Sequence, residues 1–201
     1  MGSGRRRESL VGFGGNWDLG FFEEVAYVSL PSKAGGAQMP HVGRLTHLGE
    51  LHVDSAEVTD GGLVHIANLH SREGLTLSGT RITDAGMIHL SGLTALTELH
   101  LNGPRITDLG LKNLAGLWQL EVLSLEHSQI TDHGLNIVGG LSNLHDLRMG
   151  STAITDAGLI HLVHLKQFKR LTVWGPNVTE AGVTAMRFMC AWMKINEPTI
   201  Y

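Results

Sequence analysis

A single cysteine, Cys190, stands in this chain of 201 residues. One thiol cannot form an internal disulfide, and this usage favours a reducing compartment. No apolar run approaches the ~20 residues of a membrane span. No apolar signal-peptide segment follows Arg5-Arg6-Arg7 either, because the stretch after it is polar and interrupted by glycines. These absences predict a soluble protein and favour the cytoplasm without determining the compartment.

The chain also lacks an excess of positive charge. Its formal net charge of -4 offers no general attraction to nucleic acid or to an anionic membrane surface. A glycine-rich phosphate loop, a paired-carboxylate motif, a Cys-His nucleophile pair and a serine-centred elbow are all missing from the sequence. We therefore expect a protein that is not an enzyme, with no catalytic residues, no cofactor and no nucleic-acid partner.

What the chain does contain is a repeat of 24 residues. The dipeptide Thr-Asp marks its phase, Thr179-Glu180 closes the series, and a glycine follows each threonine by three positions. The Thr-Asp pairs begin at Thr59, Thr83, Thr107, Thr131 and Thr155, and the glycines are Gly62, Gly86, Gly110, Gly134, Gly158 and Gly182.

Seven apolar columns complete each unit. In the unit 82–105 they are Ile82, Met87, Leu90, Leu93, Leu96, Leu99 and Leu101. Over six units these columns make 42 positions, and only Arg72 and Glu197 are not apolar, whereas an apolar content of 42% would fill about 18 of them by chance. The spacing from Met87 to Leu93 predicts one face of a short helix, and the alternation of Leu99 with Leu101 predicts a strand with one buried face.

The start of the predicted helix carries the phase marker. Thr83 or Asp84 suits the N-cap position, and an acidic side chain there also suits the helix dipole. A glycine inside a helix costs roughly 0.5–1 kcal/mol relative to alanine. A glycine such as Gly86 in every unit therefore predicts that a Cβ would clash there with the neighbouring coil.

One strand and one short helix cannot bury their apolar faces alone, so such units stack into arrays. Neighbouring strands should be parallel, with right-handed crossovers. We therefore predict an α/β solenoid in which Leu75, Leu99, Leu123 and Leu147 lie on neighbouring strands.

The run Leu96-x-x-Leu99-x-Leu101, followed by Ile106-Thr107-Asp108-x-Gly110-Leu111, resembles the leucine-rich repeat. It is similar in particular to the bacterial Thr-Asp-x-Gly-Leu subtype, which is related to the repeats of F-box substrate receptors. The resemblance covers roughly residues 22–197. It implies a curved solenoid with a parallel sheet on the concave face and short helices on the convex face, and a non-enzymatic scaffold that binds proteins.

One column departs from the family pattern. Where many leucine-rich repeats place Asn or Cys, this chain has Ala56, Thr80, Pro104, Ser128, Thr152 and Pro176. Alanine and proline side chains cannot bond the backbone of the next turn, so we expect no continuous side-chain ladder in this column.

The repeat predicts four segments: a flexible leader or cloning remnant over 1–20, an N-terminal cap and degenerate first coil over 21–57, five regular repeats over 58–177, and a C-terminal capping repeat over 178–201. The first coil has Gly35-Gly36 in place of Thr-Asp and Pro40 in the helical stretch, so its helix should be short or absent. Arg72 replaces a core leucine, and a stem that snorkels outward, a bulge and a functional use are all open.

The last unit places bulky side chains in the apolar columns. Met186, Met189, Trp192 and Ile195 should cover the open end of the core, with Cys190 as a small, partly buried neighbour.

Residues that flank the core positions of each strand point away from the core, to the exposed face of the sheet. The early strands are acidic with histidines, and the late ones carry Arg148, Arg170 and Trp174, a composition typical of interface anchors. The alternative is a solvated polar face on which Trp174 shields the last strand. The candidate ligand-binding residues are His52, Thr76, Glu98, His100, Asn102, Ser124, Glu126, Asp146, Arg148, Arg170, Thr172 and Trp174.

Twelve histidines raise the question of a metal site. His52 and His100 would lie two strands apart, about 9–10 Å, which Zn–N bonds of ~2.0–2.1 Å cannot bridge. His41, His65 and His89 repeat on the helical side, where helix axes are some 8–10 Å apart. We therefore expect no metal ligands.

The sequence thus predicts a non-catalytic scaffold that binds a protein or peptide through its concave sheet face. Alternatives are the substrate-recognition part of a ubiquitin-ligase-type receptor or bacterial effector, and a carbohydrate-binding module that uses Trp174. No F-box-like helical segment precedes Phe22. We expect a monomer, with edge-to-edge association of the sheet left open, and the sequence does not identify the partner.

Overall fold

The computed structural model describes residues 8–11, 25–30, 32, 35–70 and 73–189. Eight strands of this part form one sheet in chain order, and every neighbouring pair is parallel. The strands are β1 (Glu8–Val11), β2 (Val25–Leu30), β3 (Glu50–Val53), β4 (Gly74–Thr76), β5 (Glu98–His100), β6 (Val122–Ser124), β7 (Asp146–Gly150) and β8 (Arg170–Trp174).

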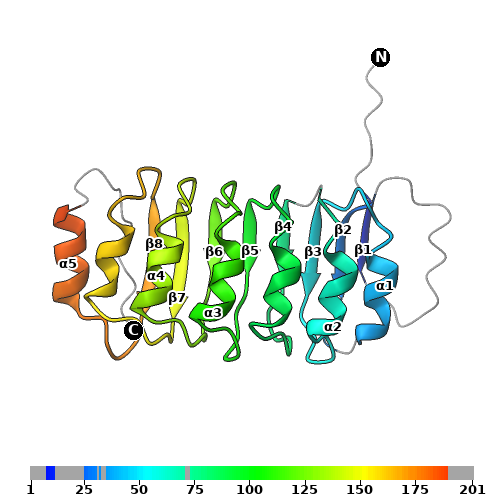
Figure 1. Cartoon of the computed structure of the whole chain (residues 1–201), viewed down its shortest axis with the longest axis horizontal. Coiled ribbons are helices and arrows are strands. Elements are labelled where there is room, and N and C mark those ends of the chain that lie inside the picture. Colours follow the sequence, from blue (N-terminus) through cyan, green and yellow to red (C-terminus); the bar gives the residue numbers. More distant parts are fainter. Residues whose placement is uncertain (1–7, 12–24, 31, 33–34, 71–72, 190–201) are drawn as a thin grey trace, which may run out of the picture.

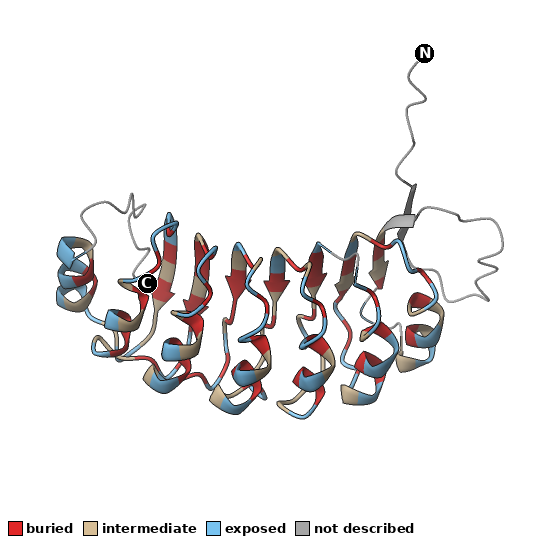
Figure 2. Ribbon diagram, turned by 45° about the horizontal axis from the view of Figure 1, so that its top comes forward, coloured by how far each residue is buried: buried red, intermediate tan, exposed pale blue. Residues whose placement is uncertain are grey.

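Short α- and 3-10 helices, the latter labelled η, form a second layer in front of the sheet in Figure 1. They are η2 (Gly36–Gln38), α1 (Met39–Val42), α2 (Asp60–Leu63), η3 (Val64–Ile66), η4 (Gly86–Leu90), α3 (Asp108–Leu111), η5 (Lys112–Leu114), α4 (Asp132–Val138), η6 (Gly158–Leu162) and α5 (Glu180–Met189). Figure 2 shows the array as an arc, with the sheet on its inner side and the helices on its outer side. Packed helices need about 8–10 Å and paired strands only about 4.8 Å, so the array bends toward the sheet.

The strand register reproduces the sequence repeat. Leu99 pairs with Leu75 on one side and with Leu123 on the other, and Leu123 pairs with Leu147. One step along the sheet therefore equals one repeat unit, as the apolar columns predict, and the α/β solenoid is confirmed.

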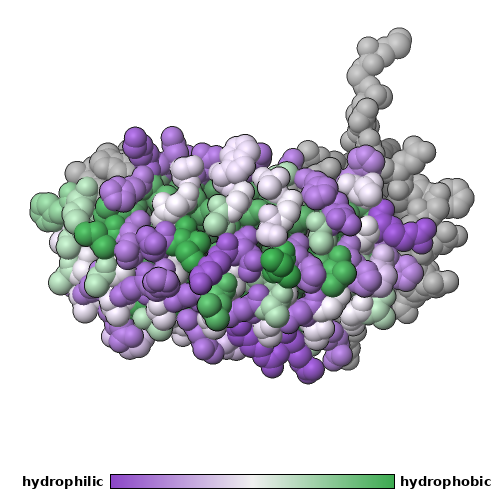
Figure 3. Space-filling model, in the orientation of Figure 1, coloured by the Kyte–Doolittle hydropathy of each residue, from purple (hydrophilic) through white to green (hydrophobic). Residues whose placement is uncertain are grey.

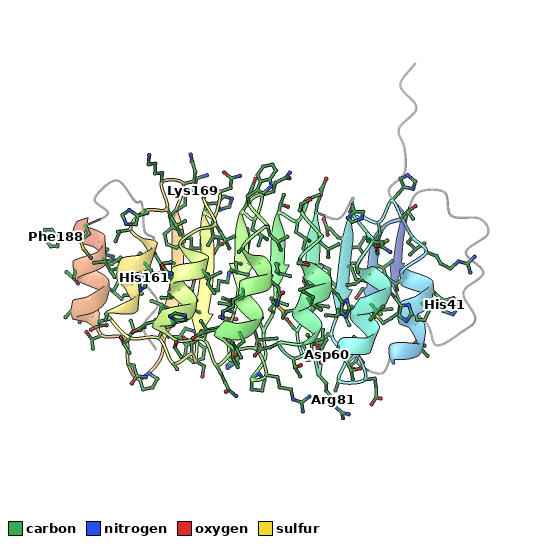
Figure 4. All side chains as sticks on the ribbon, in the orientation of Figure 1. His41, Asp60, Arg81, His161, Lys169 and Phe188 are labelled. Carbon is green, nitrogen blue, oxygen red and sulfur yellow. The ribbon has the colours of Figure 1, made fainter. Side chains whose placement is uncertain are left out.

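The apolar columns stack into one continuous core between sheet and helices. At its C-terminal end Met186 is buried, but Met189 is 50% exposed and covers less of the core than expected. Phe188 on α5 is also exposed and points away from the array in Figure 4. The expectations for Arg72, Cys190, Trp192 and Ile195 lie outside the described residues.

The N-terminal end contains one strand more than expected. Val28 and Leu30 are buried and pair with Leu51 and Val53, as a cap strand should. Residues 8–11 differ from the expected flexible leader, because they form β1 and pair with β2. An open edge of β2 would present unpaired backbone groups, and β1 satisfies them.

The helix of the first coil is short, as predicted. Pro40 lies in the first turn of α1, where a missing N–H removes no intrahelical hydrogen bond.

The threonines of later phase markers cap their helices, whereas Thr59 makes no side-chain cap bond to α2. Thr107 Oγ accepts a hydrogen bond from the Leu109 N–H at 3.2 Å, and Thr131 Oγ accepts one from the His133 N–H at the same distance. The sequence left open whether threonine or aspartate plays this part, and the structure assigns the cap to threonine.

The aspartate reaches the next coil instead. Asp84 Oδ1 accepts from the Thr107 N–H at 2.8 Å, and its Oδ2 accepts from the Thr107 hydroxyl at 2.6 Å. The same two bonds recur in the pairs Asp60–Thr83, Asp84–Thr107, Asp108–Thr131, Asp132–Thr155 and Asp156–Thr179. We refer to this series as the aspartate ladder.

In the column that departs from the family pattern, the side-chain hydrogen bonds of Thr80 and Ser128 stay within one coil. Thr80 donates to the Leu77 carbonyl at 2.9 Å and Ser128 to the Leu125 carbonyl at 2.6 Å, each within its own coil. The continuous ladder of this protein therefore lies at the helix starts and not in that column.

The repeated glycine makes room for the aspartate ladder. A Cβ added at Gly110 would lie well under 3 Å from Asp84 Oδ1. The other glycines that face the aspartate of the preceding coil in this way are Gly86, Gly134, Gly158 and Gly182. The predicted clash is confirmed, and its partner is identified. Gly62 differs because Gly36 replaces aspartate in the coil before it, and its Cβ would meet only Met39 and Val58 side-chain atoms at 3.1 and 3.2 Å.

Replacing Gly110 with alanine should destabilise the protein by about 1–3 kcal/mol, because the added Cβ displaces Asp84 from Thr107. Gly62→Ala is the matched control. It gains up to about 1 kcal/mol in helix propensity and displaces no ladder aspartate, so its net loss should be clearly smaller than that of Gly110→Ala. Urea denaturation measures both, and equal losses would contradict the role assigned to the aspartate.

Asp108→Ala should cost about 1–3 kcal/mol, because the N–H and the hydroxyl of Thr131 both lose their acceptor. Glu57→Ala removes an exposed carboxylate that accepts no hydrogen bond from any described residue, and it serves as control. Since coils contact only their neighbours, amide exchange should accelerate mainly in the two coils that Asp108 joins. A loss no larger than that of the control would argue against the ladder as a source of stability.

Candidate functional site

The sheet brings the predicted ligand-binding residues to one face. They lie on β3 to β8 or directly after β5 and β6, at positions that alternate with the core leucines. Two of them are not exposed as expected, because Ser124 and Asp146 are buried beneath their neighbours. The face therefore has an accessible part and a part that supports it.

Asn102 occupies the middle of the face and cross-links three coils. Its Oδ1 accepts from the Ser124 hydroxyl at 2.7 Å and from the Glu126 N–H at 3.1 Å, and its Nδ2 donates to Ser78 Oγ at 3.4 Å. These bonds use the polar groups that the sequence offered as ligand contacts. The middle of the face is thus largely occupied by its own hydrogen bonds.

The N-terminal half of the face is acidic. Glu50, Asp54 and Glu98 are exposed, and Glu98 contacts His100 at 2.7 Å. The ring of His52 packs against Tyr27, with centroids 5.1 Å apart. We call Glu50, Asp54 and Glu98 the acidic end of the face.

The C-terminal half contains two arginines that share one carboxylate. Asp146 Oδ2 accepts from Arg170 Nη1 at 2.7 Å and lies 3.5 Å from Arg148 Nη2. The Asp146 side chain is only 5% exposed, whereas those of Arg170 and Arg148 are 51% and 40% exposed. The buried carboxylate therefore orients two accessible guanidinium groups.

The charges of this group do not cancel. Two guanidinium groups face one carboxylate, and each guanidinium has five N–H donors, most of which Asp146 does not use. Asp146 Oδ1 is buried and accepts no hydrogen bond from any described residue. The arrangement leaves a net positive charge at the surface, and guanidinium donors for which no described residue is an acceptor.

Trp174 completes this half of the face. Its indole ring lies over Gly150, where an added Cβ would overlap the ring. The ring also packs against His127 in a T-shaped arrangement, with centroids 5.6 Å apart. Trp174 is half-buried, so part of the ring remains accessible. We call Arg148, Arg170 and Trp174 the basic–aromatic patch.

Sequence reasoning missed how His127 and Gly150 hold the indole. His127 has φ of 59°, a left-handed backbone conformation that costs a non-glycine residue roughly 1–2 kcal/mol. Its equivalent Ser151 has φ of 58°, and Gly79 in the same column has φ of 68°. A glycine at the same repeat position in other coils, such as Gly79, is the one sequence signal for this left-handed conformation.

Exposed lysines extend the positive charge beyond the patch. Lys169 directly precedes Arg170 and lies on the rim where the strands begin, whereas Arg81 lies on the opposite rim (Figure 4). Lys166 is exposed in the same connection to β8. The positive end of the molecule therefore reaches from the sheet face onto this rim.

The histidines do not converge on a metal site. His41 and His161 lie far apart, toward opposite ends of the helix row in Figure 4. Within the described residues, no three His, Cys, Asp or Glu side chains are placed to hold one metal ion. Nor does any helix in that part of the chain combine the length and apolarity that crossing a bilayer requires.

The helix side of the molecule, which faces the viewer in Figure 3, mixes polar and apolar side chains. Val64, Ile88 and Ile160 are exposed there, at one position of the repeat, but Lys112 and Asn136 occupy that position between Ile88 and Ile160. This alternation does not single out a continuous docking surface on the helices.

Residues 92–115, one repeat unit in length, match the family model described as Leucine Rich repeat. The structure is similar to internalin C2 of Listeria monocytogenes, with a TM-score of 0.62 and 24% identity over 80% of this chain and 74% of that chain. It is also similar to internalin F of the same species, with a TM-score of 0.61 and 19% identity over 88% of this chain and 54% of that chain. No curated protein matches. These likenesses establish the fold.

Gly150→Ala should displace the Trp174 indole, because the new Cβ would occupy the position of the ring. Gly103→Ala is the control, since an added Cβ there has no atom within 4 Å. The Trp174 indole N–H resonance, assigned with Trp174→Phe, should shift in the first variant and not in the second. An unchanged resonance in Gly150→Ala would contradict the stacking of the ring on the glycine.

Proposed function

We propose that this leucine-rich-repeat solenoid is a non-catalytic scaffold that binds a protein or peptide on its concave sheet face. Trp174, Arg170 and Arg148 are its principal contacts. The observation that supports the proposal is the basic–aromatic patch, in which one buried carboxylate orients two exposed arginines beside the Trp174 indole, which packs on Gly150. Tryptophan and arginine are enriched among residues that dominate binding energy, and groups held in place beforehand lose less entropy on binding.

The dimensions of the face suit a protein ligand. From β3 to β8 the sheet makes five steps of about 4.8 Å, roughly 24 Å in all. An extended segment of about seven residues, at ~3.3 Å per residue, spans this length. The inner side of the arc faces such a segment from more than one strand at once (Figure 2).

The wider setting of the scaffold is also a proposal. The Thr-Asp-x-Gly-Leu units favour the bacterial subtype with its relation to F-box receptor repeats, so the chain could serve as the substrate-recognition part of a ligase-type receptor or a bacterial effector. Each setting uses the same face for binding. A neutral carbohydrate fits less well, because the two guanidinium groups beside Trp174 favour a charged partner.

Affinity capture with mass spectrometry identifies a partner of the chain. Replacing Arg148, Arg170 and Trp174 together with alanine should weaken binding of that partner at least a hundredfold, because such anchors each contribute 2 kcal/mol or more. The control replaces Ile88, Lys112 and Ile160, three exposed helix positions of one repeat column. Calorimetry with the purified partner measures the affinities.

Loss of both arginines leaves Asp146 buried and unpaired, which destabilises the fold by itself. Trp174→Ala alone keeps the Asp146 ion pairs and should still weaken binding at least tenfold. Unchanged affinity in both the single and the triple variant would place the binding site elsewhere on the molecule.

A further inference from the structure

We infer that the basic–aromatic patch selects a protein segment carrying a short block of carboxylates next to an apolar side chain. This inference rests on the proposed function and specifies the chemical class of its partner. Two observations carry it: the donors of Arg148 and Arg170 that Asp146 leaves unused, and the opposite charge at the other end of the same face.

The geometry of the patch matches carboxylates. A guanidinium group is planar and binds a carboxylate through two parallel N–H···O bonds. Asp146 sits opposite Arg170 in the β7–β8 register and two residues before Arg148, so the two arginines are diagonal neighbours on adjacent strands. Arg170 Nη1 and Arg148 Nη2 lie 2.7 and 3.5 Å from the same Asp146 Oδ2, which holds the two forks side by side. Two acidic side chains two residues apart in an extended segment point to the same side, about 6.6 Å apart, and can each meet one fork.

Trp174 adds the apolar requirement. It lies four residues after Arg170 on β8, about 13 Å along the strand, and pairs with Gly150. Its accessible ring surface offers contact area to an aliphatic side chain of the same segment. A purely charged ligand would leave this part of the patch unused.

The acidic end of the face limits the length of the negative block. Glu50, Asp54 and Glu98 lie on β3 and β5 or next to them, and β5 is three strand steps, about 14 Å, from β8. The Debye length at physiological salt is about 8 Å, so each end acts on the charges directly above it. Negative charges that continue past β6 meet these carboxylates and are repelled.

The same argument separates a peptide from a nucleic acid. A nucleic acid is charged along its whole length, so a strand lying on the sheet would place phosphates over the acidic end as well as over the patch. Among the described residues of the sheet face, the arginines lie on β7 and β8, and Lys166 and Lys169 extend this charge onto the adjoining rim. A local group of carboxylates fits this surface, whereas a long polyanion does not.

The test uses the full chain and five fluorescein-labelled probes in anisotropy titrations. The probes are a seven-residue peptide with two acidic residues and one leucine, its amide counterpart with Gln and Asn, a lysine counterpart, a peptide with one phosphoserine in place of the acidic pair, and a single-stranded oligonucleotide. We expect the acidic peptide to bind at least tenfold more tightly than each of the others, and 0.5 M salt to weaken it severalfold. Equal binding of the amide peptide, or tighter binding of the phosphopeptide or the oligonucleotide, would overturn the inference.

Matched variants then locate the site. Asp146→Asn with Arg148→Gln and Arg170→Gln leaves no buried charge unpaired and lowers the net charge by one, and Arg81→Gln makes the same net change on the opposite rim. Only the first should lose at least tenfold in affinity for the acidic peptide. Arg148→Lys with Arg170→Lys keeps the charge but removes the planar fork, and we expect a loss of about threefold or more.

An equal loss of affinity for the acidic peptide in Arg81→Gln would show that binding follows the overall charge of the protein, and this would overturn the inference. The inference and the proposed function can also fail separately. If the captured partner depends on Trp174 and the arginines while the acidic peptide does not bind, the scaffold function stands and the acidic class of partner is wrong.

Discussion

The carboxylate that joins one coil to the next is the interaction on which the rest of the structure depends. Each ladder aspartate satisfies a backbone N–H and a hydroxyl of the following threonine, and that threonine caps its own helix. The aspartate fits only because the glycine beside it has no Cβ. Threonine, aspartate and glycine therefore form one set that spans two coils, which explains why all three recur with the same period. In an array whose units contact only their neighbours, such a junction sets the coupling between units.

The period, the core columns and the strand register could all be predicted, because burial of Leu75, Leu99 and Leu123 repeats at the same spacing as the chain itself. The direction of the aspartates could not, because a carboxylate at a helix start suits a cap and a cross-coil bond equally well. Strand β1 was missed for another reason: its four residues carry no repeat, and it forms by completing the open edge of β2.

The candidate site was predictable in outline only. Alternation along the strands correctly placed Arg148, Arg170 and Trp174 on one face. It could not show that Asp146 is buried, because that depends on an arginine one full unit later in the chain. The cross-links of Asn102 likewise depend on two neighbouring coils. Which side chains pair between coils depends on their geometry, and the residue types in a column do not determine that geometry.

The spacing between β3 and β8 has a consequence for the reach of this molecule. Because one repeat unit adds one strand to the sheet and leaves the register of the others unchanged, the separation of the acidic end from the basic–aromatic patch is counted in whole units. The repeat therefore sets the separation of the two ends in steps of about 4.8 Å. In the binding mode proposed above, a chain with one more unit between β5 and β7 would accept a ligand one to two residues longer between the same two charged ends.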